Sequence, residues 1–290
     1  MLKYFVLCLT LLLSGTSVAE PKAPIKALYI TEIGNRYHNY EKQGRLLQTR
    51  LPELLNIDIT LVGKTQEETL KVLGDRGFAD GYDLILYNAC LADSEDNEAV
   101  ANVIRQVEEF HKPIVFLHCA MHNFRYTSVE KTKDSGDEVA EARASWSSQY
   151  PGAEFPIWSN LTGIDSAHHE LPGPIWVTKT AVAHPITQTL RTNWFTPWDE
   201  LYVAANVASD VVPLYTGDRW FVKPQIVAWA RDSKGARIFG TTLGHGDRTL
   251  ENKDYQALLQ RGILWTVDGL TAEGEIKPEF GSRRKAPESN

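Results

Sequence analysis

Residues 82–124 decide the fold, and they read YDLILYNACLADSEDNEAVANVIRQVEEFHKPIVFLHCAMHNF. Tyr82–Asn88 and Pro113–His118 are short apolar runs bounded by polar residues, which predicts two buried strands. After Ser94, valine and isoleucine recur at helical spacing up to Val107, which predicts a helix between the strands. A strand, a helix and a second strand in this order form a right-handed βαβ unit with parallel strands.

The same alternation continues on both sides of this unit. On the N-terminal side we expect strands and helices in turn at Ile25–Thr31, Tyr40–Leu51, Ile57–Val62 and Gln66–Leu73. Thr65 and Glu68 form a capping-box pair before the last of these helices. Shorter strands follow at Ile175–Lys179, Glu200–Val203, Val211–Tyr215, Gln225–Ala230 and Arg237–Thr242, and Tyr255–Thr266 is expected to be a closing amphipathic helix. These elements predict an α/β fold with a three-layer, doubly wound, mostly parallel sheet.

The composition limits the class of protein. The chain has 290 residues, of which 43% are hydrophobic and 23% charged, and this globular composition fits one large domain. The formal net charge is −7 and the body of the chain has no dense Lys/Arg cluster, so nucleic-acid binding is disfavoured. Three cysteines exclude a four-cysteine metal site.

The N-terminus has the pattern of a secretory signal peptide. A basic start at Met1–Lys3 precedes the apolar run Tyr4–Leu13, and Ser17–Ala19 supplies small residues for cleavage after Ala19. We therefore expect a signal peptide at 1–19, a domain at 20–272 and a flexible polar tail at 273–290. The expected location is periplasmic or secreted, and no later segment is apolar enough to be a membrane span.

Histidines follow several of the predicted strands. His38 follows the first strand, His118 and His122 lie at the end of the fourth, and His245 follows the strand near residue 240. In doubly wound sheets ligands bind beyond the carboxyl ends of the strands, so we expect these imidazoles to meet at one edge. Imidazole exchanges protons near neutral pH. His168, His169 and His184, in contrast, have the surroundings of ordinary loop residues.

Other residue types leave several alternatives open. Three of the histidines could hold a transition metal, although no HxH or HExxH spacing is present, and we expect no cofactor to be required. Cys90 and Cys119 follow neighbouring strands and could form a disulfide, an inert pair or, through Cys119, a nucleophile. Trp198 is one of several tryptophans in polar surroundings that suit the C–H faces of sugars.

A resemblance adds to these interpretations. Gln225–Gly269 (QIVAWARDSKGARIFGTTLGHGDRTLENKDYQALLQRGILWTVDG) resembles the C-terminal signature of the ThuA-like, or trehalose-utilisation, family, and earlier pieces such as KPIVFLHCAMHNF agree in order. The resemblance implies a class I glutamine-amidotransferase-like, flavodoxin-like fold and a role in sugar catabolism. Lys112–His118 is similar to the amidotransferase nucleophile strand. His118 stands in the place of the nucleophile, which argues against glutamine hydrolysis.

Together these observations predict an exported enzyme that acts on a glycoside or keto-sugar by acid–base chemistry. We expect His118 and His245 to be the acid–base pair, with Glu200 orienting one of them or serving as a base. His38, His122, Asp247 and Trp198 would complete the substrate pocket. The alternatives are a non-catalytic carbohydrate-binding protein and a metal-dependent hydrolase. The expected partner is a small sugar, and a homo-oligomer is compatible with the sequence.

Overall fold

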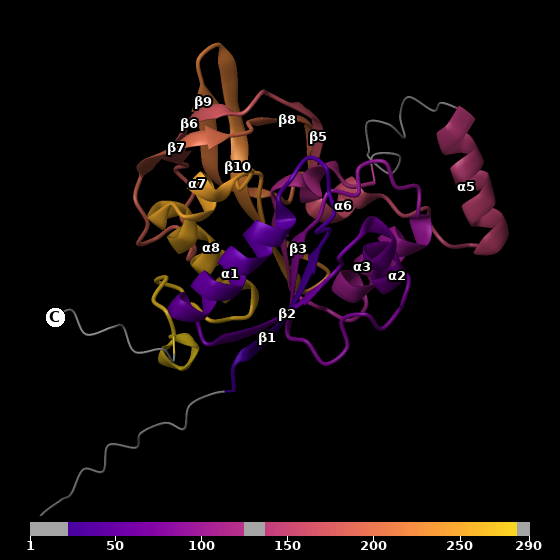
Figure 1. Cartoon of the computed structure of the whole chain (residues 1–290), viewed down its shortest axis with the longest axis horizontal. Helices are drawn as coiled ribbons and strands as arrows, with labels where there is room; N and C mark the ends of the chain where they lie inside the picture. The colour runs from indigo at the N-terminus through magenta and orange to yellow at the C-terminus, as the bar shows by residue number, and fades with distance from the viewer. Residues whose placement is uncertain (1–22, 125–136, 283–290) are drawn as a thin grey trace, which may run out of the picture.

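The computed structural model describes residues 23–124 and 137–282 and contains one large sheet and one small sheet (Figure 1). The predicted signal peptide and the last residues of the predicted tail, 283–290, lie outside the described residues. The large sheet has nine strands in the order β2-β1-β3-β4-β11-β10-β9-β6-β7, and β5 pairs with β8 in the small sheet.

The first five strands of the large sheet run parallel. They are β2 (Ile57–Val62), β1 (Ile25–Thr31), β3 (Leu84–Asn88), β4 (Ile114–Leu117) and β11 (Ala236–Thr241). This is the strand order of a flavodoxin-like sheet, in which the chain reverses direction across the sheet between β1 and β3. The predicted parallel, doubly wound sheet is therefore confirmed for this half of the molecule.

The other half is antiparallel. It consists of β10 (Val222–Ser233), β9 (Val212–Arg219), β6 (Gly173–Lys179) and β7 (Asn193–Asp199), beside the small sheet of β5 (Ile164–His169) and β8 (Tyr202–Val207). The prediction that a strand begins at Glu200 is wrong, because β8 begins at Tyr202. Glu200 lies between β7 and β8, where the chain crosses from one sheet to the other. The strands β5 and β7 were not predicted.

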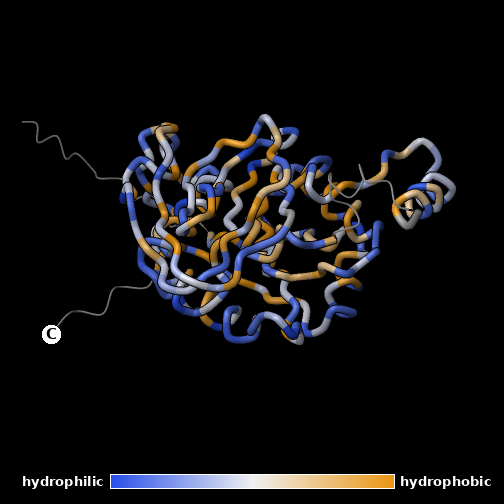
Figure 2. The backbone as a smooth tube through the Cα atoms, turned by 90° about the horizontal axis from the view of Figure 1, so that it is seen from above, coloured by the Kyte–Doolittle hydropathy of each residue, from blue (hydrophilic) through white to orange (hydrophobic). Residues whose placement is uncertain are grey.

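Helices cover both faces of the parallel half. On one face α1 (Tyr40–Leu54) and α8 (Lys253–Thr266) bury apolar residues such as Leu47 and Leu264 against the sheet. On the other face α2 (Gln66–Leu73), α3 (Asn97–Glu108) and α6 (Trp158–Thr162) form a second core. Figure 2 shows that hydrophobic residues gather mostly toward the middle of the molecule and hydrophilic residues mostly along its periphery. The three-layer arrangement follows from burial of both sheet faces.

The remaining helices of the described residues are short or peripheral. They are η1 (His118–His122), α5 (Asp137–Gln149), α7 (Asp247–Leu250) and η3 (Pro278–Phe280). In Figure 1 α5 lies at one side of the molecule, away from the large sheet. Within the described residues, no helix has the length and apolar character needed to cross a bilayer.

Local sequence signals explain several of the element ends. Thr65 Oγ1 accepts a hydrogen bond from Glu68 N at 3.1 Å, while the Glu68 carboxylate accepts one from Lys64 N, so the predicted cap of α2 is confirmed. Helix α1 continues past the predicted end at residue 51, with Pro52 in its last turn. Pro52 removes one helical N–H there without ending the helix, because the turn still closes from Leu55 N to Leu51 O.

The prediction of a flexible tail is wrong for residues 273–282. Ile276 forms a β-bridge with Leu270, and Gly281 forms one with Leu55. Phe280 is only 4% exposed, and its carbonyl accepts a hydrogen bond from Asn56 N at 3.0 Å. One buried aromatic side chain thus anchors a segment whose polar composition is typical of a loose terminus.

Candidate functional site

His118 begins η1 at a sharp turn directly after β4. Its φ is +46°, in the left-handed region that a residue with a Cβ rarely adopts, and its side chain is fully buried. Leu117 pairs with Thr241 across β4 and β11, so His118 lies beside the end of β11. There its Nδ1 is 2.8 Å from the carbonyl oxygen of Thr242. A carbonyl only accepts, so Nδ1 carries the proton and the ring presents Nε2 to the site.

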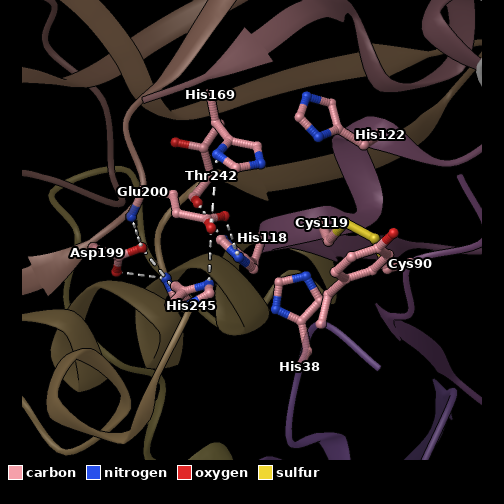
Figure 3. Close-up of polar contacts among 12 residues, drawn as sticks. His38, Cys90, His118, Cys119, His122, His169, Asp199, Glu200, Thr242 and His245 are labelled. Atoms are coloured by element: carbon pink, nitrogen blue, oxygen red, sulfur yellow. Dashed lines mark hydrogen bonds and ion pairs between the residues drawn. A yellow bond between two sulfur atoms is a disulfide. The ribbon is translucent and has the colours of Figure 1, made fainter. Parts of the chain in front are cut away.

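Glu200 lies in the crossing between β7 and β8, and its carboxylate faces three histidines (Figure 3). Its Oε2 is 3.3 Å from His118 Nε2, and its Oε1 is 3.3 Å from His245 Nδ1. His169 Nδ1 lies 3.6 Å from the same Oε1. The structure therefore brings together the three residues that we predicted to be catalytic, His118, His245 and Glu200, and adds His169.

His38 completes the cluster from the loop after β1. Its ring centroid is 4.9 Å from that of His118 and 5.2 Å from that of His245, and the last two are 5.3 Å apart. Asn35 shapes this loop, because its Oδ1 accepts a hydrogen bond from His38 N at 3.1 Å. One nitrogen each of His38, His118 and His245 lies within 4.8 Å of the other two, a spacing that could suit a metal ion.

Buried polar groups behind the cluster hold His245 in place. Asp199 is fully buried, and its carboxylate accepts hydrogen bonds from the backbone N–H groups of Gly244 at 2.8 Å and His245 at 3.2 Å. The His245 carbonyl accepts a hydrogen bond from Gln43 Nε2 of α1 at 3.0 Å. Neither Asp199 nor Gln43 was predicted to have this role, and no local pattern marks them.

The electrostatics of the cluster differ from one ring to another. Burial lowers the pKa of His38 to about 2, helped by the neighbouring His118 and His245, so His38 is neutral. Burial opposes the charged form of His118, but the Glu200 carboxylate and the charge of Asp199 raise its pKa overall. Burial also opposes the charged form of Glu200, but its contacts with His118 and His245 lower its pKa well below the ordinary range.

The cluster meets solvent on the side of His245 and His169. The His245 side chain is 20% exposed and that of His169 is 37% exposed, whereas His118 has no exposed surface. Our interpretation of His169 as an ordinary loop residue is wrong, because it ends β5 and its ring contacts Glu200. The sequence contains no signal for this, since only the pairing of β5 with β8 turns the ring toward the site.

The other predicted substrate-binding residues lie at the margin. His122 stacks on Tyr202, with ring centroids 4.3 Å apart, and contacts Ser166 Oγ at 2.8 Å. Asp247 forms an ion pair with Lys42 of α1 rather than joining the imidazoles. Trp198 is 49% exposed and lines, with Asp247, a shallow hollow of about 310 Å³ next to the His245 loop.

Cys90 and Cys119 form a disulfide between the ends of β3 and β4. Their Cα atoms are 5.1 Å apart, and the bond lies directly beside His38 in Figure 3. A sulfur in a disulfide is not a thiolate, so Cys119 in this state is no nucleophile. His118 occupies the turn that follows β4, and the cysteine comes one residue later.

The parallel half, the sharp turn after β4 and the convergence of side chains at one sheet edge define a class I glutamine-amidotransferase-like α/β protein. Two solved structures share this fold. A ThuA-like protein from Parabacteroides merdae superposes with a TM-score of 0.61 at 18% identity, covering 91% of this chain and 94% of that one. A ThuA-like protein from Bacteroides uniformis gives 0.58 at 15% identity, with coverages of 87% and 95%.

The sequence assigns the chain to a family within this class. The profile of the ThuA family, described as trehalose utilisation, matches residues 80–266, and the chain belongs to this family. The predicted family and fold class are thus confirmed. No curated protein matches the chain in sequence. A carbohydrate deacetylase, Agd3, also shares the fold, with a TM-score of 0.51 at 12% identity over 84% of this chain and 32% of its own.

Proposed function

We propose that this protein is an exported enzyme of carbohydrate catabolism that transforms a glycoside or keto-sugar by histidine and carboxylate chemistry. The observation that carries the proposal is the Glu200 carboxylate, 3.3 Å from the ring nitrogens of both His118 and His245. A carboxylate between two imidazoles provides both a proton acceptor and proton donors within one buried group. The association of the ThuA family with trehalose utilisation supports a sugar as the substrate.

A keto-sugar suits this chemistry because its carbonyl group acidifies the neighbouring C–H bond. The base takes that proton, and the electron pair of the C–H bond forms the enolate. The enolate then expels the substituent oxygen on the next carbon, which leaves as an alcohol after taking a proton from the donor. The cluster gains one proton and gives one back, so no oxidant or reductant is needed. A proton donor near the enolate oxygen stabilises the charge that develops there.

The exposed fraction of each side chain suggests its role in this scheme. His245 is the partly exposed ring and therefore meets the substrate, while the buried His118 holds the carboxylate from behind. The hollow lined by Trp198 and Asp247 adjoins the His245 loop and offers an aromatic face on which a second sugar ring can stack. In this proposal the reacting sugar lies over His245 and the leaving group lies over Trp198.

The test compares turnover of 3-keto-glycosides by the wild type and by His118→Ala, His245→Ala and Glu200→Gln. We expect each substitution to slow turnover by about 100-fold or more, the range that acid–base catalysis contributes. His184→Asn is the matched control, because His184 packs on Trp265 in another part of the molecule. Full activity in all three variants would overturn the assignment. A wild type that is stabilised by sugar but leaves it unchanged would be a binding protein.

Export is supported by the disulfide as well as by the N-terminal pattern. Disulfides persist in oxidising compartments and are rare where glutathione keeps thiols reduced. If the protein is expressed in its own host, we expect the mature chain to begin at Glu20 in the periplasm or the medium. N-terminal sequencing of the fractionated protein tests this expectation, and an intact Met1 in the cytoplasmic fraction would contradict it.

A further inference from the structure

The imidazole cluster contains buried nitrogens without hydrogen-bond partners. Nδ1 of His38, Nε2 of His118 and Nδ1 of His245 are all buried in this way, and so is Oε2 of Glu200. A buried polar atom without a hydrogen bond costs about 1–3 kcal/mol. His118 Nε2 and His245 Nδ1 each lie 3.3 Å from a Glu200 oxygen, and these ion pairs offset part of that cost. Nδ1 of His38 has no hydrogen bond within the described residues, so the cluster lacks a partner on that side. The four atoms come from four separate segments of the chain that converge at the same edge of the sheet (Figure 3).

The tautomer of His118 shows what kind of partner is missing. Because Nδ1 donates its proton to the Thr242 carbonyl, a neutral His118 presents a lone pair at Nε2. That lone pair faces the Oε2 lone pairs of Glu200 at 3.3 Å. Two acceptors at this distance are compatible only if a cation lies between or beside them. The cation is either a proton or a metal ion.

The number and type of donors favour a transition metal. Three imidazoles with one carboxylate alongside are typical of zinc and chemically related divalent ions, and catalytic zinc sites use three protein ligands. The Thr242 carbonyl and the Asp199 carboxylate orient two of the ligands from behind, as outer-shell partners do in metal sites. His245 leaves one side of the cluster accessible to solvent, which a catalytic ion needs.

The three ligand nitrogens need to move only slightly closer together to bind one ion. The three ligand nitrogens lie within 4.8 Å of one another. A tetrahedral ion with Zn–N bonds of about 2.1 Å places its ligand atoms about 3.4 Å apart. Rotations of exposed or loop-borne rings such as His38 and His245 can close this difference. The cysteines beside His38 do not compete for the ion, because their sulfurs are joined in the disulfide.

We infer that His38, His118 and His245 form a binding site for one divalent transition-metal ion of the zinc type, with Glu200 beside it as the balancing carboxylate. The inference deepens the proposed function, on whose site it rests. A bound ion would polarise the carbonyl oxygen of a keto-sugar as a Lewis acid. Proton transfer would then fall to Glu200, since the imidazoles serve as ligands.

The experiment measures binding of Co²⁺ and Zn²⁺ without any sugar. Chelator-treated protein, made without a polyhistidine tag, is titrated with Co²⁺ by calorimetry and by visible absorption, and Zn²⁺ is used to displace it. We expect one Co²⁺ per chain with the intense absorption of a low-coordinate ion. His38→Ala, His118→Ala and His245→Ala should each weaken binding by more than the roughly 10–100-fold that loss of an outer-shell partner costs. His184→Asn, outside the ligand set and packed on Trp265, should bind as the wild type does.

Two results would overturn the inference. One is a folded wild type that binds no Co²⁺ or Zn²⁺ in one-to-one stoichiometry, which decides the matter even if a variant fails to fold. The other is undiminished binding by the triple alanine variant. Turnover of 3-keto-glycosides by chelator-treated protein is measured separately. Turnover by a protein that binds neither Co²⁺ nor Zn²⁺ would refute this inference and leave the proposed function intact. Metal binding without turnover would support this inference and refute the proposed function.

Discussion

Asp199→Asn tests the idea that one buried carboxylate holds the loop that carries His245. Asp199 Oδ2 accepts a hydrogen bond from Gly244 N at 2.8 Å, and Oδ1 accepts from Glu200 N at 2.8 Å and from His245 N at 3.2 Å. The side chain has no exposed surface, so water cannot replace a lost acceptor. The substitution keeps the shape of the side chain and changes only its charge and one of its acceptors.

The magnitude follows from these three hydrogen bonds. The oxygen of the asparagine amide can still accept the hydrogen bonds from Glu200 N and His245 N. Its NH₂ group then faces the N–H of Gly244, which loses its acceptor. An unsatisfied buried donor costs about 1–3 kcal/mol. The two remaining bonds lose their charge assistance, which roughly halves their strength and costs about 0.5–1 kcal/mol each. We therefore expect the free energy of unfolding to fall by about 3 kcal/mol.

Urea unfolding followed by tryptophan fluorescence measures this change. The matched control is Asp247→Asn, the same chemical change two residues beyond His245, where the carboxylate pairs with the exposed Lys42. We expect the control to shift the midpoint little, because solvent-exposed ion pairs contribute little to stability. If Asp199→Asn and Asp247→Asn lower stability equally, Asp199 does not hold the loop as argued. The metal affinity of Asp199→Asn should fall too, since His245 would lose its support.

Three further predictions concern the disulfide, a buried histidine and a glycine. Replacing both Cys90 and Cys119 by Ser should lower the free energy of unfolding by about 3–4 kcal/mol, because the bridge closes a loop with a sequence separation of 29 residues, as denaturant titration can show. His184 has its pKa lowered to about 4 by burial and by a nearby arginine, and its Nδ1 accepts a backbone hydrogen bond at 3.2 Å. The unfolded chain takes up this proton below about pH 6.5 while the folded chain does not, so stability should fall by about 1–2 kcal/mol between pH 6.5 and 4 relative to His184→Asn. Gly244→Ala should cost about 1–3 kcal/mol by thermal or chemical unfolding, because φ is +121° there and a Cβ would lie 3.0 Å from the Tyr255 hydroxyl.

Each of these has a matched comparison. Reduction of the wild type should reproduce the loss seen in the double serine variant, and equal stability of the oxidised and reduced forms would contradict the first prediction. Parallel stability curves for the wild type and His184→Asn from pH 7 to 4 would contradict the second. Gly246→Ala is the control for the third, since a Cβ at Gly246 meets nothing within 4 Å and φ is −145°.

Much of the first half of the fold was predictable because its signals are local. Apolar runs such as Tyr82–Asn88 and Pro113–His118 and the capping pair Thr65 and Glu68 report secondary structure within a few residues. The antiparallel half was predicted less well. The segments β5 and β7 contain histidine, asparagine and proline among their apolar residues, so neither composition nor alternation distinguishes them from loops.

The sequence by itself determined the order of the strands and helices in the parallel half of the fold, the position of His118 at the end of the fourth strand and the membership in the ThuA family. Tertiary structure alone decided that Glu200 lies between His118, His245 and His169, and that Asp199 and Gln43 hold His245 from behind. The physical reason is the separation along the chain over which each kind of interaction acts. Hydrophobic periodicity and capping act between neighbours in the chain, whereas these polar contacts join segments that meet only after both sheets have formed.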